Sequence, residues 1–221
     1  MTNEEILQQI YDETLVGNKP AVVELTTRGI EAKMDPNTLL FEALIPALEE
    51  VGARFERGDF FVPEMLISGR AMTGALELLR PLLVDSGTAK VGTFLMGTVQ
   101  GDVHDIGKNL VNIMLEGAGF DVIDIGVQVR PETFIAAIEE HKPDVVGFSA
   151  FLTTTMPMFK ANIEAIERAG LRDDVIIMVG GAPVTQEYAD VVGADGYAAD
   201  ASSATKRAKE LLLQRRTMVS V

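Results

Sequence analysis

The stretch that decides the fold runs from Val91 to Asn109 and reads VGTFLMGTVQGDVHDIGKN. Residues 91–98 are mostly apolar and predict a buried strand, and an amphipathic helix is expected over residues 107–118. The loop between them places His104 two positions after Asp102. A strand that leads through a short polar loop into a helix is the repeating unit of parallel α/β folds.

The Asp102–His104 pair has the composition of a metal-ligand site. An imidazole can bind a metal through one ring nitrogen while a carboxylate accepts a hydrogen bond from the other, which fixes the tautomer and raises the basicity of the ligand. In this scheme His104 is the ligand and Asp102 its support. An Asp-x-His pair alone more often marks a hydrogen-bonded structural histidine, so the surrounding sequence has to decide.

After residue 89 the sequence alternates between strands and helices. Strands are predicted over residues 91–98, 122–126, 145–150, 175–179 and 196–198. Helices are predicted over residues 107–118, 132–141, 155–169 and 185–192, and from about residue 202. This pattern predicts a doubly wound, flavodoxin-like or Rossmann-like parallel sheet of order 2-1-3-4-5. Such sheets bind ligands at the carboxyl ends of their strands, where His104, Ser149 and Gly180-Gly181 should meet.

Residues 1 to about 85 are predicted to form four helices. Apolar residues recur at helical spacing from Ile6 onward, and Asp35-Pro36 supplies an N-cap followed by a first-turn proline. Four such helices predict an antiparallel bundle. The polar break Asp85-Ser86-Gly87-Thr88 is the expected linker. We therefore predict a helical cap domain over residues 1–88 and an α/β domain over residues 89–221.

Composition narrows the class of protein. The 221 residues include no cysteine, which excludes disulfides, thiolate nucleophiles and cysteine-based metal centres. The second of the two histidines, His141, is expected at a helix end near the last carbonyls. A net charge of -14 argues against a nucleic-acid partner. No apolar run approaches the roughly 20 residues that span a bilayer, and the N-terminus has no secretory signal, so we expect no membrane partner and a cytoplasmic location.

Two nucleotide-binding motifs can be rejected. Five residues separate Gly101 from Gly107, where the phosphate-binding loop has four, and Asn109 stands where that motif has Ser or Thr. Dinucleotide binding fails as well, because the first turn lacks Gly-x-Gly-x-x-Gly. A flavodoxin-like mononucleotide module is a weaker alternative.

Two other loops carry unusual residues. Gly180-Gly181 predicts either a tight turn or a place where a bulky planar group approaches the backbone closely. Three consecutive threonines, Thr153-Thr154-Thr155, follow the third strand. We expect one of them to cap the next helix and the others to face the ligand crevice.

Taken together, Asp102-x-His104-x-x-Gly107, then Ser149, then Gly180-Gly181 resemble the cobalamin-binding signature Asp-x-His-x-x-Gly, Ser-x-Leu, Gly-Gly in order and spacing. The resemblance covers residues 89 to about 215, and the preceding helices look like the cap of methyltransferase corrinoid proteins. Proteins of the methylamine, methanol and methoxyaromatic systems are similar, as is the cobalamin module of methionine synthase. Phe151 replaces the Leu of the signature, and we expect its ring to reshape the pocket for the cofactor's nucleotide tail without touching the cobalt chemistry.

The resemblance implies a cobalamin cofactor, methylcobalamin in the loaded state, whose dimethylbenzimidazole base is displaced from cobalt. His104 would take the lower axial position, and Asp102 and Thr155 would form a proton path from its other ring nitrogen. Tail contacts are implied for Ser149, Thr153, Gly180, Gly181 and Ala201. All residues implied to contact the cofactor are Gly101, Asp102, Val103, His104, Asp105, Ile106, Gly107, Ser149, Phe151, Leu152, Thr153, Gly180, Gly181 and Ala201.

By the same resemblance the protein is a corrinoid methyl carrier of one-carbon metabolism that completes no turnover alone. A substrate-specific methyltransferase would place a methyl group on Co(I). A methylcorrinoid:acceptor methyltransferase would move it from methyl-Co(III) to tetrahydrofolate or coenzyme M, and a reductive activase would repair oxidised cobalt. The apolar stretch Phe60-Phe61-Val62-Pro63 of the cap, with Met65 and Met72 following it, would form an apolar edge that covers the methyl group at rest. Two alternatives stay open: an adenosylcobalamin mutase small subunit, which usually lacks such a cap, and a cobalamin-dependent sensor, which needs an output domain.

Overall fold

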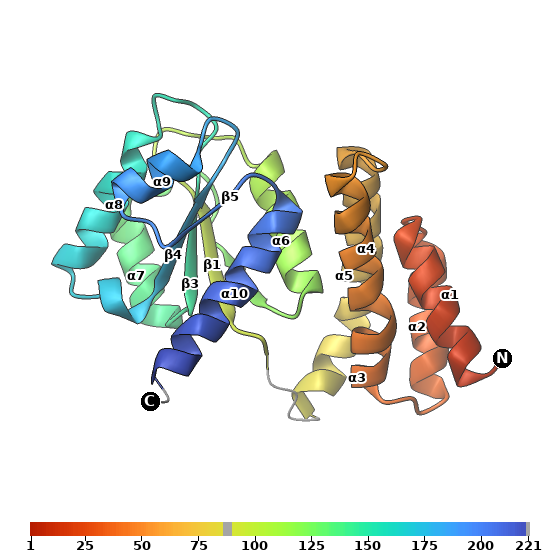
Figure 1. Ribbon diagram of the computed structural model, residues 1–221. Helices are drawn as coiled ribbons and strands as arrows, with labels where there is room; N and C mark the ends of the chain where they lie inside the picture. The colour runs from red at the N-terminus through yellow and green to blue at the C-terminus, as the bar shows by residue number, and fades with distance from the viewer. Residues whose placement is uncertain (86–89, 220–221) are drawn as a thin grey trace. The chain divides into compact units, whose positions relative to one another are not determined.

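The computed structural model describes residues 1–85 and 90–219. They fall into two compact units, one formed mainly by residues 1–90 and the other mainly by residues 91–221. The first is helical and the second alternates strands with helices (Figure 1). Residues 86–88 of the predicted linker lie outside the described residues. No helix in the described ranges is both long and apolar enough to cross a membrane.

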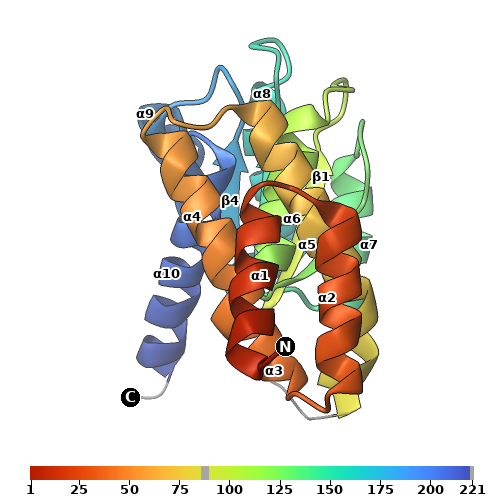
Figure 2. The same ribbon diagram turned by 90° about the vertical axis from the view of Figure 1, so that its right-hand side faces the viewer.

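Four helical segments make up the first unit, as the spacing of apolar residues predicts (Figure 2). A capping box fixes the first helix, because Thr2 and Glu5 each accept a hydrogen bond from the other's backbone N–H. Asp35 caps the third segment through the backbone N–H of Asn37. The segments are α1 (Asn3–Leu15), α2 (Lys19–Glu31), α3 (Pro36–Leu39) continuing through η1 (Leu40–Leu44) into α4 (Ile45–Glu56), and α5 (Val62–Asp85).

A π-helical turn, η1, interrupts the third segment and was not predicted. Within it the N–H of Ile45 donates to the carbonyl of Leu40, five residues earlier. The turn comes just before Pro46, which has no N–H and whose ring would clash with the carbonyl four residues before it in a regular α-helix. Widening the helix by one residue relieves that clash and lets the segment continue as α4.

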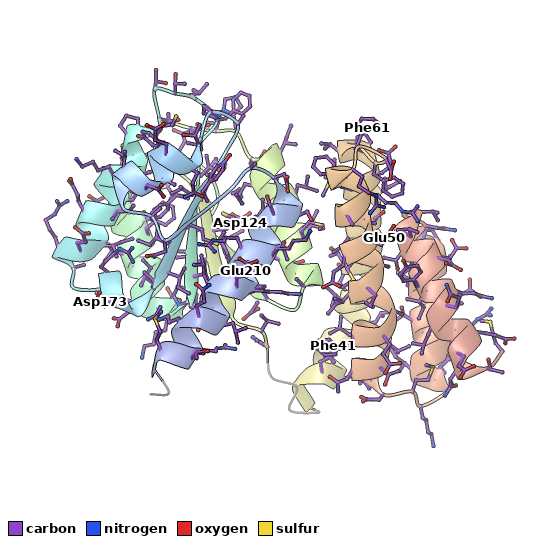
Figure 3. All side chains as sticks on the ribbon, in the orientation of Figure 1. Phe41, Glu50, Phe61, Asp124, Asp173 and Glu210 are labelled. Atoms are coloured by element: carbon purple, nitrogen blue, oxygen red, sulfur yellow. The ribbon has the colours of Figure 1, made fainter. Side chains whose placement is uncertain are left out.

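The turn between α4 and α5 exposes apolar side chains. Phe61, labelled in Figure 3, is 65% exposed and its neighbour Val62 is 40% exposed. The preceding ring, Phe60, lies 5.2 Å from the guanidinium carbon of Arg54. The apolar edge predicted at this turn is confirmed for Phe61 and Val62, but it is wrong for Met65 and Met72, which are fully buried in the core of the helical unit.

The second unit is a five-stranded, all-parallel sheet in the order β2-β1-β3-β4-β5, which confirms the predicted fold class. Its boundaries lie within two residues of those expected from the sequence. The strands are β1 (Thr93–Thr98), β2 (Asp121–Asp124), β3 (Val145–Ser149), β4 (Ile176–Gly180) and β5 (Gly196–Ala198). The helices are α6 (Ile106–Gly117), α7 (Pro131–His141), α8 (Pro157–Arg168), η2 (Arg172–Asp174), α9 (Gln186–Val192) and α10 (Ala201–Val219).

Helices cover both faces of this sheet. Figure 1 shows α6 and α10 on one side and α7, α8 and α9 on the other. Leu95 and Phe148 point to the layer of α7, α8 and α9, where they belong to one buried core. Because side chains alternate along a strand, Thr98 and Ser149 point to the opposite face. His141 is the last residue of α7, the position predicted for it.

Candidate cofactor-binding site

The ends of four strands meet at the carboxyl edge of the sheet. Thr98 of β1 is in register with Ser149 of β3, Ser149 with Gly180 of β4, and Gly180 with Ala198 of β5. The loops that follow β1, β3 and β4 therefore leave the sheet next to one another, as the strand order predicts. The three predicted site segments are thus brought to one edge.

The backbone of the loop after β1 is tied down on both sides. Thr98, buried at the end of the strand, donates its hydroxyl to the carbonyl of His104 at 3.1 Å. The N–H of Gln128 donates to the carbonyl of Asp102 at 3.0 Å. Gly101 has a φ of 85°, which residues with a side chain rarely adopt. Gly101 was among the predicted site residues, whereas Thr98 and Gln128 were not, because their roles depend on how the loop folds back.

Asp102 holds both the backbone and the ring of His104. Its Oδ1 accepts the backbone N–H of His104 at 3.0 Å and lies 2.7 Å from Nδ1 of the imidazole. A carboxylate partner requires the proton on Nδ1, which leaves the lone pair on Nε2. The imidazole is 44% exposed, whereas the Asp102 side chain is fully buried. The pair therefore places a partly exposed imidazole, with its lone pair on Nε2, on a buried support.

The other carboxylate oxygen ties this loop to the turn after β3. Oδ2 of Asp102 accepts the hydroxyl of Thr155 at 2.7 Å, the N–H of Phe151 at 2.8 Å and the N–H of Leu152 at 3.2 Å. Asp102, His104 and Thr155, which the sequence analysis grouped, are thus in direct contact. The two backbone donors were not predicted, because a main-chain N–H has no signature in the sequence.

These contacts decide the ionisation of Asp102. Burial is the largest single influence and raises the pKa of the carboxyl group. Hydrogen bonds from Thr155, from the backbone and ring of His104 and from Phe151 outweigh it together, and they hold the pKa of Asp102 well below its usual range. The carboxylate is therefore ionised at neutral pH and keeps the proton of the imidazole on Nδ1.

The prediction that one threonine after β3 caps the next helix is wrong. Helix α8 begins at Pro157, and its N-cap residue Met156 makes no side-chain capping bond. The hydroxyl of Thr155 is engaged by Asp102 instead, and the proline at the first helical position has no N–H to be capped. Thr153 and Thr154 are exposed in the turn, and their expected position facing the ligand crevice stays a prediction.

Phe151 lies against the imidazole of His104. The two ring centroids are 4.4 Å apart and the ring planes are inclined by 30°. This contact with the candidate metal ligand was not predicted. The expected effect of Phe151 on the pocket for the nucleotide tail stays a prediction.

Apolar side chains flank the imidazole at the carboxyl edge. Exposed apolar side chains that gather in one place mark a binding surface. Next to them, a Cβ on Gly107 would meet no atom within 4 Å, so the start of α6 is also open. This surface suits a large ligand that covers the imidazole. Its apolar members, 37% to 71% exposed, are Val103, Ile106, Val127, Phe151 and Leu152.

The two glycines after β4 serve different needs. Gly181 has a φ of 132°, and a Cβ on it would lie 1.8 Å from the carbonyl oxygen of Ala150. Backbone packing alone therefore requires glycine there. A Cβ on Gly180 would meet only the carbonyl oxygen of Ala198, at 3.4 Å. The close backbone approach predicted for this pair is thus a protein contact at Gly181, whereas Gly180 leaves space for a ligand.

The other predicted tail-pocket residues lie on the α10 side of the sheet. Ser149 is half-buried and in register with Gly180. Ala201 is buried at the first position of α10, shortly after the end of β5, and Ala204 and Ala208 continue the buried face of this helix. Ser149, Gly180 and Ala201 therefore belong to one end of one layer, beside the His104 loop.

An ion pair between a buried lysine and a partly exposed aspartate lies beside this loop and was not predicted. Lys108, in the first turn of α6, contacts both carboxylate oxygens of Asp124, labelled in Figure 3, at the end of β2. The Lys108 side chain is 2% exposed. Asp124 also accepts the side-chain amide of Asn112 at 3.0 Å and the N–H of Gly126 at 2.9 Å. These contacts fix the start of α6, but a pair so far apart in sequence is visible only once the helix is packed.

The side chains at this site fit a metal ion whose other ligands belong to a bound cofactor. Among the described residues, no group of three or more His, Asp or Glu side chains could hold a metal ion. A single imidazole suits a metal already held in a macrocycle, which needs one further ligand along its axis. Nε2 of His104, in an apolar surrounding, is such a ligand.

Comparison with known proteins extends to both units. Two family models described as a B12 binding domain match the chain, one over residues 92–207 and the other over residues 6–80. The dimethylamine corrinoid protein 1 of Methanosarcina acetivorans is 42% identical over 213 residues, which cover 96% of this chain and 100% of that protein.

Solved structures show the same fold. A chain in the methanol:cobalamin methyltransferase complex from Methanosarcina barkeri matches with a TM-score of 0.82 and 30% identity, over 95% of this chain and 80% of that chain. A cobalamin-binding protein from Desulfitobacterium hafniense matches with a TM-score of 0.75 and 29% identity, over 95% of this chain and 97% of the other.

Proposed function

Because this chain belongs to the corrinoid proteins built on B12 binding domains, we propose that it carries methyl groups between two methyltransferases. Its cofactor is a cobalamin or related corrinoid. One observation carries the proposal: Asp102 holds Nδ1 of His104 and leaves Nε2 accessible in an apolar surface.

His104 is proposed as the lower axial ligand of the cobalt. When bound, the corrinoid supplies the chemistry, since its cobalt accepts a methyl group as Co(I) and releases it from methyl-Co(III). Asp102 keeps Nδ1 protonated and so raises the basicity of Nε2. Thr155 donates to the far oxygen of the same carboxylate. If the imidazole leaves the metal and takes up a proton at Nε2, the buried carboxylate held by Thr155 would stabilise the resulting positive charge.

We assign the rest of the cofactor to two neighbouring surfaces. The residues of 101–107 together with Phe151 and Leu152 would contact the corrin ring, because they form the apolar surface around the imidazole. Ser149, Gly180 and Ala201 would line the pocket of the nucleotide tail. The open space beside Gly180 supports that assignment. Gly181 and Thr153 would contribute at its entrance.

The partners follow from the role of a carrier. A substrate-specific methyltransferase would load the methyl group, a second would pass it to tetrahydrofolate or coenzyme M, and a reductive activase would restore oxidised cobalt. We propose a cytoplasmic location for the protein, in keeping with the expectation from the sequence. A methylated amine is the proposed donor class, supported by the 42% identity to a dimethylamine corrinoid protein.

Residues 1–88 would act as a separate cap domain that shields the cofactor bound by residues 89–221.

The test combines cofactor loading with methyl transfer. Protein reconstituted with hydroxocobalamin should show the visible spectrum of imidazole-bound Co(III), and after chemical reduction it should accept a methyl group only when a methyltransferase is added. Amine-specific and methanol-specific enzymes are compared as donors. His141→Ala is the matched control, because it removes the chain's other histidine, 36% exposed at the end of α7, and should leave the spectrum unchanged.

Two other results would redirect the assignment. Radical products that depend on adenosylcobalamin would identify a mutase subunit. A change of oligomeric state on illumination, without methyl transfer from any methyltransferase, would identify a sensor.

A further inference from the structure

The contact with Asp102 leaves the His104 ring one freedom. The hydrogen bond restrains the position of Nδ1, but the plane of the ring can still tilt. This motion is possible because the outer torsion of a histidine side chain has broad minima. The imidazole is 44% exposed, so packing from the core does not stop such a motion. The direction of Nε2 therefore needs a second restraint.

The Phe151 ring is in a position to provide this second restraint on the imidazole. It lies across the imidazole with a centroid distance of 4.4 Å and an inclination of 30°. Phe151 is itself anchored, because its N–H donates to Oδ2 of Asp102 at 2.8 Å. One buried carboxylate thus holds both rings, His104 through Oδ1 and Phe151 through Oδ2.

A planar side chain at this position acts differently from an aliphatic one. Two rings in face contact, here inclined by 30°, lose contact area when the angle between them widens, so the pair opposes rotation of the imidazole plane in that direction. A leucine in the same place would touch the ring with branched methyl groups and leave its plane free. The aromatic ring is 52% exposed, which shows that burial in the core is not the reason for its placement.

We propose that Phe151 is a positioning residue, which fixes the plane of the His104 imidazole and thereby the direction of Nε2. This inference rests on the proposed function, in which Nε2 binds the cobalt. Loss of the aromatic pair should lower the ratio of His-bound to His-free cofactor by about two- to tenfold, the range expected for one such pair.

The first measurement uses the protein without cofactor. Selective labelling of histidine gives signals from two rings only, and His141, at the end of α7, serves as an internal reference. Stacking on Phe151 should shift the C–H resonances of His104 upfield by ring-current shielding. Phe151→Leu should abolish that shift and Phe151→Tyr should keep it. Absence of the shift in the unmodified protein would overturn the stacking.

The second measurement uses protein loaded with methylcobalamin, in which the methyl group would weaken the bond from cobalt to a ligand on its opposite side. The His-bound to His-free ratio, read from the visible spectrum, should fall about two- to tenfold in Phe151→Leu and stay unchanged in Phe151→Tyr. An unchanged ratio in Phe151→Leu, with the ring-current shift lost, would overturn the positioning role. If the unmodified protein shows no His-bound form, His104 is not the ligand and the proposed function fails, whereas an intact ring-current shift would show that the stacked geometry is correct.

Discussion

Replacement of Asp102 by Asn changes the centre of the site without changing its shape. The carboxylate accepts five hydrogen bonds, and an amide brings an NH2 group to one of its two oxygen positions. At the Oδ2 position the NH2 would face the N–H groups of Phe151 and Leu152. At the Oδ1 position it would face one backbone N–H, that of His104, while Nδ1 of the imidazole could turn into an acceptor. We expect the second orientation, because it leaves fewer backbone donors without a partner.

In this orientation the amide should lower the free energy of unfolding and change the spectrum of the bound cobalt. One unpaired N–H at His104 should lower the free energy of unfolding by about 1–3 kcal/mol. Nδ1 would accept from the new amide, so the proton would move to Nε2 and remove the lone pair that binds cobalt. Urea unfolding of the protein without cofactor measures the change in the free energy of unfolding. Ring ¹⁵N shifts report the tautomer, with His141 as the reference, and the Co(III) spectrum should change to the water-bound form.

The pH dependence of stability separates this mechanism from a general packing defect. The pKa of Asp102 is depressed in the fold relative to its ordinary value of 3.8. The ionised group therefore stabilises the fold above pH 3.8, and this contribution is lost as the pH falls below that value. The difference in unfolding free energy between the unmodified protein and Asp102→Asn should be constant near neutral pH and narrow in acid. A constant difference through the acid range, or an Nδ1-protonated ring with an unchanged spectrum in the variant, would refute the reasoning.

Three further changes test neighbouring parts of the site. His104→Ala should convert the Co(III) spectrum from imidazole-bound to water-bound while cobalamin remains bound through its tail, and an unaltered spectrum would remove His104 from the cobalt. Thr155→Val takes one donor from Oδ2 and should lower the unfolding free energy by about 1.5–3 kcal/mol, most of which Thr155→Ser should restore; equal stability of all three proteins would contradict this. A chain of residues 89–221 should still bind cobalamin, and its bound methylcobalamin should photolyse faster than in the full chain; equal rates would show that the helical domain gives no shielding.

The arrangement of strands and helices could be predicted because it is encoded by local periodicity. Alternation of apolar strands with amphipathic helices gave the parallel sheet and its strand order, and boundaries such as those of β5 were correct to the residue. The π turn over Leu40–Leu44 was not predicted. The apolar pattern of the third helix continues through it, and the demand that Pro46 makes on the preceding backbone does not alter that pattern.

The candidate site was predictable to the extent that it depends on side-chain identity. Asp102, His104 and Thr155 carry recognisable chemistry, and the structure places them in contact. The backbone donors to Asp102 were not predicted, because any residue can supply a backbone N–H. The role of the Thr98 hydroxyl was not predicted either, because its partner, the carbonyl of His104, comes within reach only when the loop folds back. The position of Phe151 against His104 is a long-range contact between two loops, which spacing along the chain cannot reveal.

The network around Asp102 also bears on how the protein exchanges its cobalt ligand. All five donors to the carboxylate are protein groups, so the loop and the turn are ordered by folding itself. Ordering one backbone residue costs about 1–2 kcal/mol of conformational entropy. A loop that had to be ordered by the corrinoid would lose that amount from the affinity for every residue it immobilised. Here the site is preorganised, so in the proposed function His104 would leave the metal and return to it without the loop having to fold again.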